Sequence, residues 1–175
     1  MLSSSVFWGV LAIMVFWAVG AYHRIMRLRS AALQAFGGLD VHWVRLLAML
    51  GECDAAQVTA GWVMVAGRRE WLAAMNRFAA CLAVARARPL QPEVAAELLV
   101  ARQALDATWA ALLAGPDVPS DIWVPWAQRW EQQRQQNALA TEQFNHAVAQ
   151  YNEAITQFPA SILARFFGFK AAVPL

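Results

Sequence analysis

The strongest candidates for metal ligation in this 175-residue chain are Glu142 and His146, which stand four positions apart. On a helix this spacing puts both side chains on one face, where they could share a metal ion. No third ligand lies nearby, so we interpret His146 as solvated or hydrogen-bonded. Glu93 and Glu97 also share a helical spacing, but they closely follow Pro92. Acidic residues behind a proline are typical of the first turns of a helix, so neither pair predicts a metal or catalytic site.

Motifs for other kinds of chemistry are missing from the sequence. It contains no Gly-rich phosphate loop, HExxH, GxSxG or CxxC. Cys53 and Cys81 would lie about 42 Å apart on one helix, far beyond disulfide reach. The net charge is only +2, and no window combines clustered Lys or Arg with aromatic residues. We therefore predict a protein that is not an enzyme and that binds no metal, cofactor or nucleic acid.

A long uncharged run occupies residues 6–22. With the uncharged residues before it, the run reaches about 33 Å as a helix, enough to cross a bilayer core. Trp8 lies near one end, and Trp17 and Tyr22 near the other, as is typical of residues at membrane interfaces. A buried core helix fits less well because the run is apolar on every face. A cleaved signal peptide stays an alternative, with a small-residue site at 18–20, although no basic residue precedes the run.

Basic residues flank only one end of this run. Arg24, Arg27 and Arg29 follow it, and none precedes it. The positive-inside rule then puts the N-terminus outside and the rest of the chain in the cytoplasm. We predict a single-pass protein of the cell inner membrane, with residues 1–22 as the anchor and residues 23–175 as a helical domain.

Hydrophobic periodicity predicts helices throughout this domain. The first should run on from the anchor, weaken at the tandem glycines 37–38 and stop near Gly51. Asp54 and Gln57 resemble a capping box, which would start a second helix that ends near residue 88 before a proline. Its predicted seam consists of Val58, Val65, Leu72 and Ala79, with Trp62, Met75 and Leu82 in between.

Two further helices follow. The third should begin at Pro92 and end at Gly115, and the fourth should begin between Ser120 and Trp126 and end near Phe158. No strand pattern of comparable length occurs. The fold class is therefore predicted to be all-α: an N-terminal transmembrane helix followed by an elongated antiparallel four-helix bundle. Because the helices alternate in direction, the chain after the fourth helix should return to the membrane.

Two amides interrupt the apolar stripe of the fourth helix. Gln133 and Asn137 fall in phase with Trp130 and Phe144. Either they form a buried polar contact that fixes the register, or the helix rotates there and Leu139 takes their place. We favour rotation, because burying an unpaired amide costs about 1–3 kcal/mol.

The C-terminal third carries a recognisable series of short motifs. They are Phe144-Asn145, Tyr151-Asn152, Phe158-Pro159 and Gly168-Phe169. This series resembles the C-terminal signature of the LemA family, which this chain also resembles in size and in its single N-terminal membrane helix. Residues 42–46 lack the family's Ile-Pro-Asn-Leu-Val segment, as expected of a divergent member. The resemblance implies an anchored cytoplasmic helical bundle of unestablished molecular function, and it implies no catalytic residue.

The signature also has a physical interpretation. Asn145 and Asn152 share one helical face, so their amides could bond a neighbouring helix or its terminus. Pro159 should end the fourth helix. The residues around Gly168 admit two interpretations, since their aromatic rings could close the bundle core or could lie at the membrane interface with basic neighbours at the headgroups. The residues concerned are Arg165, Phe166, Phe167, Phe169 and Lys170.

Seven tryptophans follow the anchor, and most should belong to the core. Trp123, Trp126 and Trp130 come after a proline-rich connection at the membrane-distal end, where they could contact a partner. Our leading hypothesis is a non-enzymatic module at the inner membrane that recruits an unidentified membrane or cytoplasmic protein through this cluster or through the arginines of residues 68–77. The alternative is a protein that organises the lipid bilayer by lateral homo-oligomerisation and by interfacial contact of its C-terminal segment.

Overall fold

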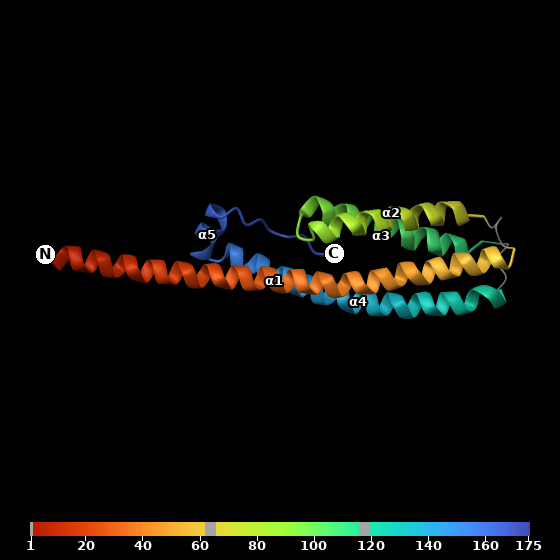
Figure 1. The fold of residues 1–175 in the computed structure, drawn as a ribbon, viewed down its shortest axis with the longest axis horizontal. Coiled ribbons are helices and arrows are strands. Elements are labelled where there is room, and N and C mark those ends of the chain that lie inside the picture. Colours follow the sequence, from red (N-terminus) through yellow and green to blue (C-terminus); the bar gives the residue numbers. More distant parts are fainter. Residues whose placement is uncertain (1, 62–65, 116–119) are drawn as a thin grey trace.

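A computed structural model of the chain describes residues 2–61, 66–115 and 120–175, and over these it is helical, without strands. The helices are α1 (Leu2–Thr59), α2 (Arg68–Ala87), α3 (Pro92–Leu113), α4 (Ser120–Thr156) and α5 (Ala160–Phe166). Figure 1 shows α1 and α4 as a long antiparallel pair and α2 with α3 as a shorter hairpin laid along it. The prediction of an elongated all-α bundle is confirmed, and the short α5 is an addition to it.

Helix α1 is longer than the sequence predicted. The predicted stop at Gly51 and the predicted start of a second helix at Asp54 are wrong, because both residues lie inside α1. Burial on one face continues without interruption through Leu50, Cys53 and Gln57, and this outweighs the roughly 1 kcal/mol that each helical glycine costs relative to alanine. The amide of Gln57 donates to Cys53 Sγ at 3.0 Å instead of capping a new helix.

Helix α2 therefore begins later and buries a different face. It starts at Arg68, after Gly67 in a left-handed conformation (φ 82°). Of the predicted seam, Leu72 is half-buried and Ala79 is exposed, whereas Val58 lies in α1 and is 47% exposed. Trp62 and Val65 fall outside the described residues. The buried face of α2 instead consists of Trp71, Ala74, Phe78, Leu82 and Ala85.

Helices α3 and α4 match their predicted ranges, but the rotation predicted within α4 is wrong. Asn137 is fully buried, while Leu139 is 63% exposed. The Gln133 amide donates to the His42 backbone carbonyl at 3.3 Å and to Asn137 Oδ1 at 3.2 Å. The large ring of Phe144 is buried on the same face and fixes the rotation of α4 about its axis. Asn137 is therefore buried and Gln133 half-buried. Phe158, near which the fourth helix was predicted to end, follows α4 and is 82% exposed.

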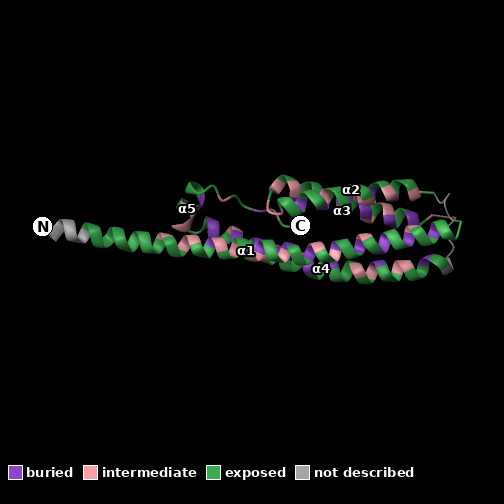
Figure 2. Cartoon of the chain, in the orientation of Figure 1, coloured by how far each residue is buried: buried purple, intermediate pink, exposed green. Residues whose placement is uncertain are grey.

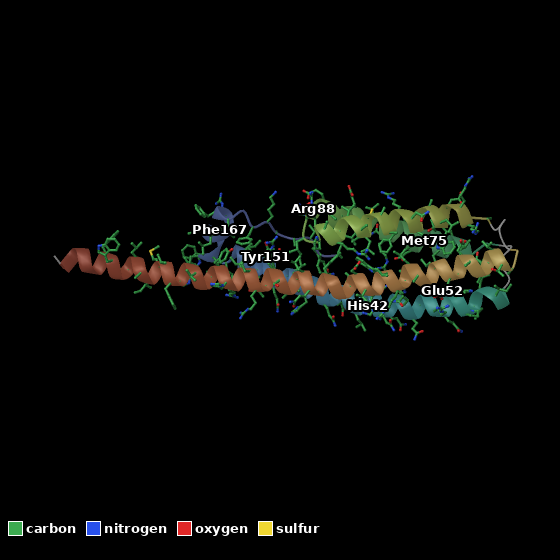
Figure 3. The ribbon with its side chains drawn as sticks, in the orientation of Figure 1. His42, Glu52, Met75, Arg88, Tyr151 and Phe167 are labelled. Carbon is green, nitrogen blue, oxygen red and sulfur yellow. The ribbon has the colours of Figure 1, made fainter. Side chains whose placement is uncertain are left out.

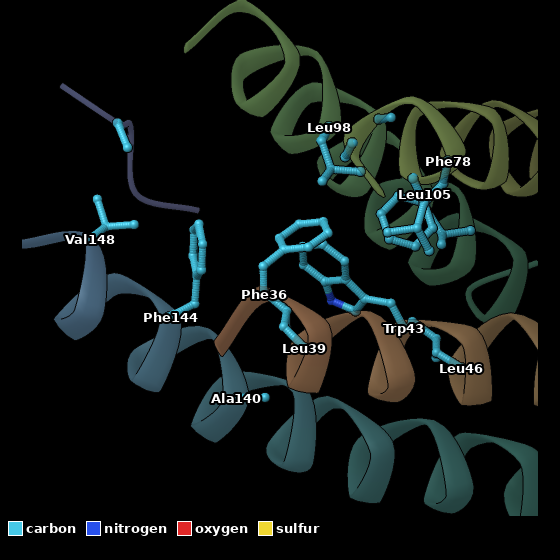
Figure 4. Close-up of a cluster of buried hydrophobic side chains, with 14 of the residues drawn as sticks. Phe36, Leu39, Trp43, Leu46, Phe78, Leu98, Leu105, Ala140, Phe144 and Val148 are labelled. Atoms are coloured by element: carbon cyan, nitrogen blue, oxygen red, sulfur yellow. The ribbon is translucent and has the colours of Figure 1, made fainter. Parts of the chain in front are cut away.

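Aromatic side chains fill the core along its length. In the middle, Trp43 packs against Phe78 and Phe36 at centroid distances of 5.6 and 6.5 Å, and Phe36 packs against Phe144 at 5.8 Å (Figure 4). At the end of the bundle far from the N-terminus of α1, Trp109 is the centre of a second cluster (Figure 1). Its ring stacks on Trp130 at 4.9 Å, with the rings of Trp71 and Trp123 at 5.7 and 6.1 Å.

Candidate membrane-contact site

The N-terminal end of α1 projects beyond the rest of the molecule (Figure 2). By length and composition this helix could span a membrane, and only 6% of its most apolar window is buried. Phe7, Ile13 and Phe16 are 63, 71 and 83% exposed. These side chains are not the core of a folded domain, and they face whatever surrounds the protein at this end.

Helix α5 lies beside the C-terminal half of this exposed run. Two shallow apolar grooves, of ≈ 580 and ≈ 510 Å³, separate the two elements, and both are lined by Ile13 and Trp17 from α1 and by Pro159 at the start of α5. The ring of Tyr22 approaches Phe167 to 5.1 Å between centroids. Since α4 is antiparallel to α1, it places α5 at the end of the molecule that carries the apolar run (Figure 1).

The outer face of α5 is an apolar stripe. It consists of Ile162 and Phe166, which stand four positions apart on α5 and are 62 and 83% exposed, together with Phe158, which precedes α5 and is 82% exposed. Ala164 is the only side chain of α5 buried in the bundle and Leu163 is half-buried, whereas Ile162 and Phe166 are exposed. Such an orientation is unfavourable in water and typical of a segment at the surface of a bilayer.

Basic side chains follow this apolar band. Arg24 and Arg27 of α1 are exposed, as are Arg165 at the end of α5 and Lys170 beyond it. Of the interfacial residues predicted from the sequence, Phe166 and Phe167 are exposed, whereas Phe169 is half-buried against the core. The structure thus brings the predicted aromatic and basic residues together at the end of the apolar run.

Two asparagines of the C-terminal signature bind the chain's own tail. Asn145 Nδ2 donates to the carbonyl of Leu175 at 2.7 Å, and its Oδ1 accepts from the Leu175 amide at 2.7 Å. Asn152 makes the same pair of bonds with Ala172, at 2.8 and 2.9 Å. The predicted partner, a neighbouring helix or its terminus, is replaced by an extended segment that follows α5.

The spacing of these bonds explains why the tail is extended. Asn145 and Asn152 are seven positions apart on α4, a rise of about 10.5 Å. Ala172 and Leu175 are three positions apart, which an extended chain spans in about 10 Å. The two amides therefore match an extended backbone in register, and we call this pair the asparagine ladder. Sequence reasoning identified both residues but could not identify the tail as their partner.

Tyr151 adds a third contact between α4 and the tail. Its hydroxyl donates to the carbonyl oxygen of Lys170 at 3.0 Å. Burial raises the pKa of the Tyr151 hydroxyl, and the positive charge of Arg29 acts in the opposite direction. Gly168, with φ 69°, provides the left-handed turn between α5 and this segment.

The remaining candidates from the sequence are histidine, carboxylate and cysteine side chains. Among the described residues, no group of three His, Cys, Asp or Glu side chains could hold a metal ion. His146 Nε2 lies 3.0 Å from the Gln150 amide. Cys53 is buried, and desolvation raises the pKa of its thiol from 9.0 to about 11.

The predicted tryptophan contact surface is also largely absent. Trp123 and Trp130 are only 2 and 8% exposed, and only Trp126 is half-buried, beneath the guanidinium of Arg129 at 4.7 Å from its ring centroid. The first two rings are core residues because they enclose Trp109, so they are not available to a partner.

Comparison with known proteins bears on the segment that contains the asparagine ladder. The sequence model of the LemA family matches residues 128–174, from α4 to the end of the tail. This match confirms the family resemblance read from the C-terminal motifs. No curated protein and no solved structure matches the chain.

Proposed function

We propose that this LemA family protein is a membrane-anchored scaffold without enzymatic activity, attached to the bilayer by both the apolar part of α1 and the outer face of α5. The observation that carries this proposal is the exposed stripe of Phe158, Ile162 and Phe166, positioned beside the uncovered apolar run of α1. In this arrangement the chain crosses the membrane once and touches it a second time.

Two attachments give the bundle a defined orientation. A single helix fixes only depth in a bilayer, and its tilt is set by packing and by interfacial anchors. A second apolar contact on α5 would limit tilt and rotation of the rod formed by α1 and α4. The bundle would then hold its distal end at a fixed distance from the lipid, which is the property expected of a scaffold.

The proposed location is the cell inner membrane, with the N-terminus outside and the bundle in the cytoplasm. Arg24 and Arg27 support this orientation because both follow the apolar run, and basic residues favour the cytoplasmic side. A C-terminal fusion to alkaline phosphatase should be inactive in cells, and an N-terminal fusion active. An active C-terminal fusion would reverse the proposed topology.

The contact of α5 with lipid can be tested by spin labelling of the full chain in bilayers. A background with Cys53→Ala and Cys81→Ala accepts one label at a time. Labels introduced by Ile162→Cys or Phe166→Cys should be accessible to oxygen and shielded from a water-soluble nickel chelate. Leu139→Cys is the matched control, because Leu139 is an equally exposed apolar residue on the part of α4 that lies in the bundle.

The outcome at these positions decides the proposal. If the labels at 162 and 166 were as accessible to the nickel chelate as the label at 139, α5 would lie in water. The exposed stripe would then be a surface for another protein.

A second candidate function is recruitment of a membrane or cytoplasmic protein, or of a second copy, through the outer face of α2. Arg69 and Arg77 are exposed there, whereas Arg68 is bound to Asp54 at 2.6 Å. Arg69→Ala with Arg77→Ala should remove such a partner in crosslinking experiments. Trp126→Ala provides the comparison for the distal surface.

A further inference from the structure

A groove between the tail and the corner joining α2 and α3 collects positive charge. It has a volume of ≈ 540 Å³ and is lined by Arg29 of α1, Arg88 at the corner and Lys170 of the tail. No aspartate or glutamate is among its lining residues. In Figure 3, Arg88 lies at one side of this region, and Tyr151 and Phe167 lie toward α5.

The three cations are not neutralised within the part of the chain that the structure describes. None of them lies within 4.0 Å of a carboxylate, although six other arginines do. Asp40, from α1, is held by Arg86 at 2.8 Å. Uncompensated charges of one sign that converge from three segments create a field that attracts an anion.

The asparagine ladder positions one of these cations. Lys170 precedes Ala172, which Asn152 binds through two hydrogen bonds, and its carbonyl accepts the Tyr151 hydroxyl at 3.0 Å. The backbone that directly follows the Lys170 Cα is therefore attached to α4 at two points. Without these contacts the lysine would move with a free tail, and the groove would lose one wall.

One end of the groove lies at the end of the apolar run. Phe167 and Phe169 line it, and their rings lie 5.1 and 6.1 Å from Tyr22, at the end of the apolar run. Arg29 is seven positions further along α1, about 10 Å beyond Tyr22. The polar layer of a bilayer extends roughly 5–8 Å from its hydrocarbon core, so the backbone of Arg29 lies a few ångströms beyond this layer.

We propose that this groove binds the phosphate of an anionic phospholipid headgroup, with Arg88 and Lys170 as ligands and the asparagine ladder as the support that positions Lys170. A guanidinium matches phosphate oxygens in a bidentate manner, and the ammonium of a lysine adds a point charge. This inference rests on the proposed membrane contact, which would place the groove at the headgroups. The same chemistry could accept inorganic phosphate from solution, and the experiment separates the two sources.

The test uses native mass spectrometry of the full chain titrated in detergent micelles with phosphatidylglycerol or phosphatidylcholine. Phosphatidylglycerol should bind more tightly. Each cation near a membrane surface is worth about fivefold in affinity, so Arg88→Gln with Lys170→Gln should weaken phosphatidylglycerol binding about 25-fold. Arg69→Gln with Arg77→Gln, which removes the same charge outside the groove, should leave binding unchanged.

A second variant tests the role of the ladder. Asn145→Ala with Asn152→Ala keeps every charge and should weaken binding about fivefold, the share of Lys170 alone. Unchanged binding in this variant would refute the positioning role. Circular dichroism of each variant should show unaltered helix content, which separates loss of the groove from loss of the fold.

Three results would overturn the proposal in different ways. If the Arg88 and Lys170 variant and the Arg69 and Arg77 variant lost the same affinity for phosphatidylglycerol, the binding would depend on net charge alone and not on the groove. Equal affinity for phosphatidylglycerol and phosphatidylcholine would show that the groove does not select an anionic headgroup, and would refute the proposed site. Inorganic phosphate that competes fully with phosphatidylglycerol, and that binds equally well without lipid, would support a phosphate site but refute a lipid source. The spin-label experiment at residue 166 uses a neutral bilayer without anionic lipid. Its result therefore tests the scaffold proposal separately from the lipid-binding proposal.

Discussion

The asparagine ladder makes a quantitative prediction about the tail. Replacement of Asn145 and Asn152 by alanine removes four hydrogen bonds between α4 and the segment from Ala172 to Leu175. Because the helices pack through other residues, the main effect should be local: the tail should detach more often while the bundle stays folded.

The expected size follows from the contacts. A net hydrogen bond contributes about 0.5–1.5 kcal/mol, so each asparagine with two bonds should contribute about 1–3 kcal/mol. One such substitution should raise the population of the detached tail by about 5- to 150-fold, and the two substitutions together by more. The buried methyl of Ala172 and the packing of Leu175 against the core stay in place and limit the effect.

Hydrogen exchange of the full chain, followed by mass spectrometry of peptides that cover residues 167–175, measures this detachment. Deuterium uptake in these peptides should accelerate by the factors above in Asn152→Ala, and further in the double variant. Peptides from α2 and α3 should exchange as in the unaltered protein. Asn76→Ala is the matched control, because it removes the same amide from an exposed position on α2.

The reasoning would be refuted by unchanged uptake in the tail peptides of the double variant. That result would mean that the apolar contacts of Ala172 and Leu175 hold the tail and that the amide bonds contribute nothing net. An acceleration in every peptide would contradict the local character of the effect, since it would show that the tail is part of one cooperative unit with the bundle.

Further predictions concern the core. Phe144→Ala should lower the free energy of unfolding by about 3–5 kcal/mol in denaturant titrations, whereas Phe158→Ala should leave it nearly unchanged, because only the first ring is buried. Asn137→Leu should be neutral or stabilising in the same assay, because the Asn137 Nδ2 is buried without a partner among the described residues. A loss of stability above about 2 kcal/mol would show that the hydrogen bond from Gln133 outweighs the cost of burying this unpaired Nδ2. The pKa of Cys53 is raised from 9.0 to about 11, so the folded state favours the neutral thiol. The neutral thiol should contribute about 2–3 kcal/mol to the free energy of unfolding, fully below pH 9 and less as the pH rises toward 11. Cys53→Ala should therefore flatten the alkaline end of the stability profile.

The sequence alone determined the helices that have strong local signals. Pro92 and the acidic residues behind it predicted the start of α3, and the apolar periodicity from Trp130 to Tyr151 predicted most of α4. The uncharged run before Arg24 predicted a helix that could span a membrane, because the signal consists of composition over some twenty residues and needs no partner. The C-terminal motifs indicated a resemblance to the LemA family because they too are local patterns, and the family model matches residues 128–174.

Only the tertiary structure decided where local signals compete. Asp54 and Gln57 have the spacing of a capping box, yet packing continues α1 through them to Thr59, since Leu50, Cys53 and Gln57 stay buried on one face. Local propensity is worth about 1 kcal/mol per residue or less, and burial of a continuous face outweighs it.

The candidate site depended even more on long-range contacts. The asparagines, the tail and Arg88 are separated by up to 87 positions, and no periodicity relates them. Their juxtaposition arises because α4 returns antiparallel to α1 and the chain then reverses at Gly168, so that the tail runs back over α4. The residue types in the sequence predicted which side chains could form hydrogen bonds or bind anions, and the path of the chain determined their partners.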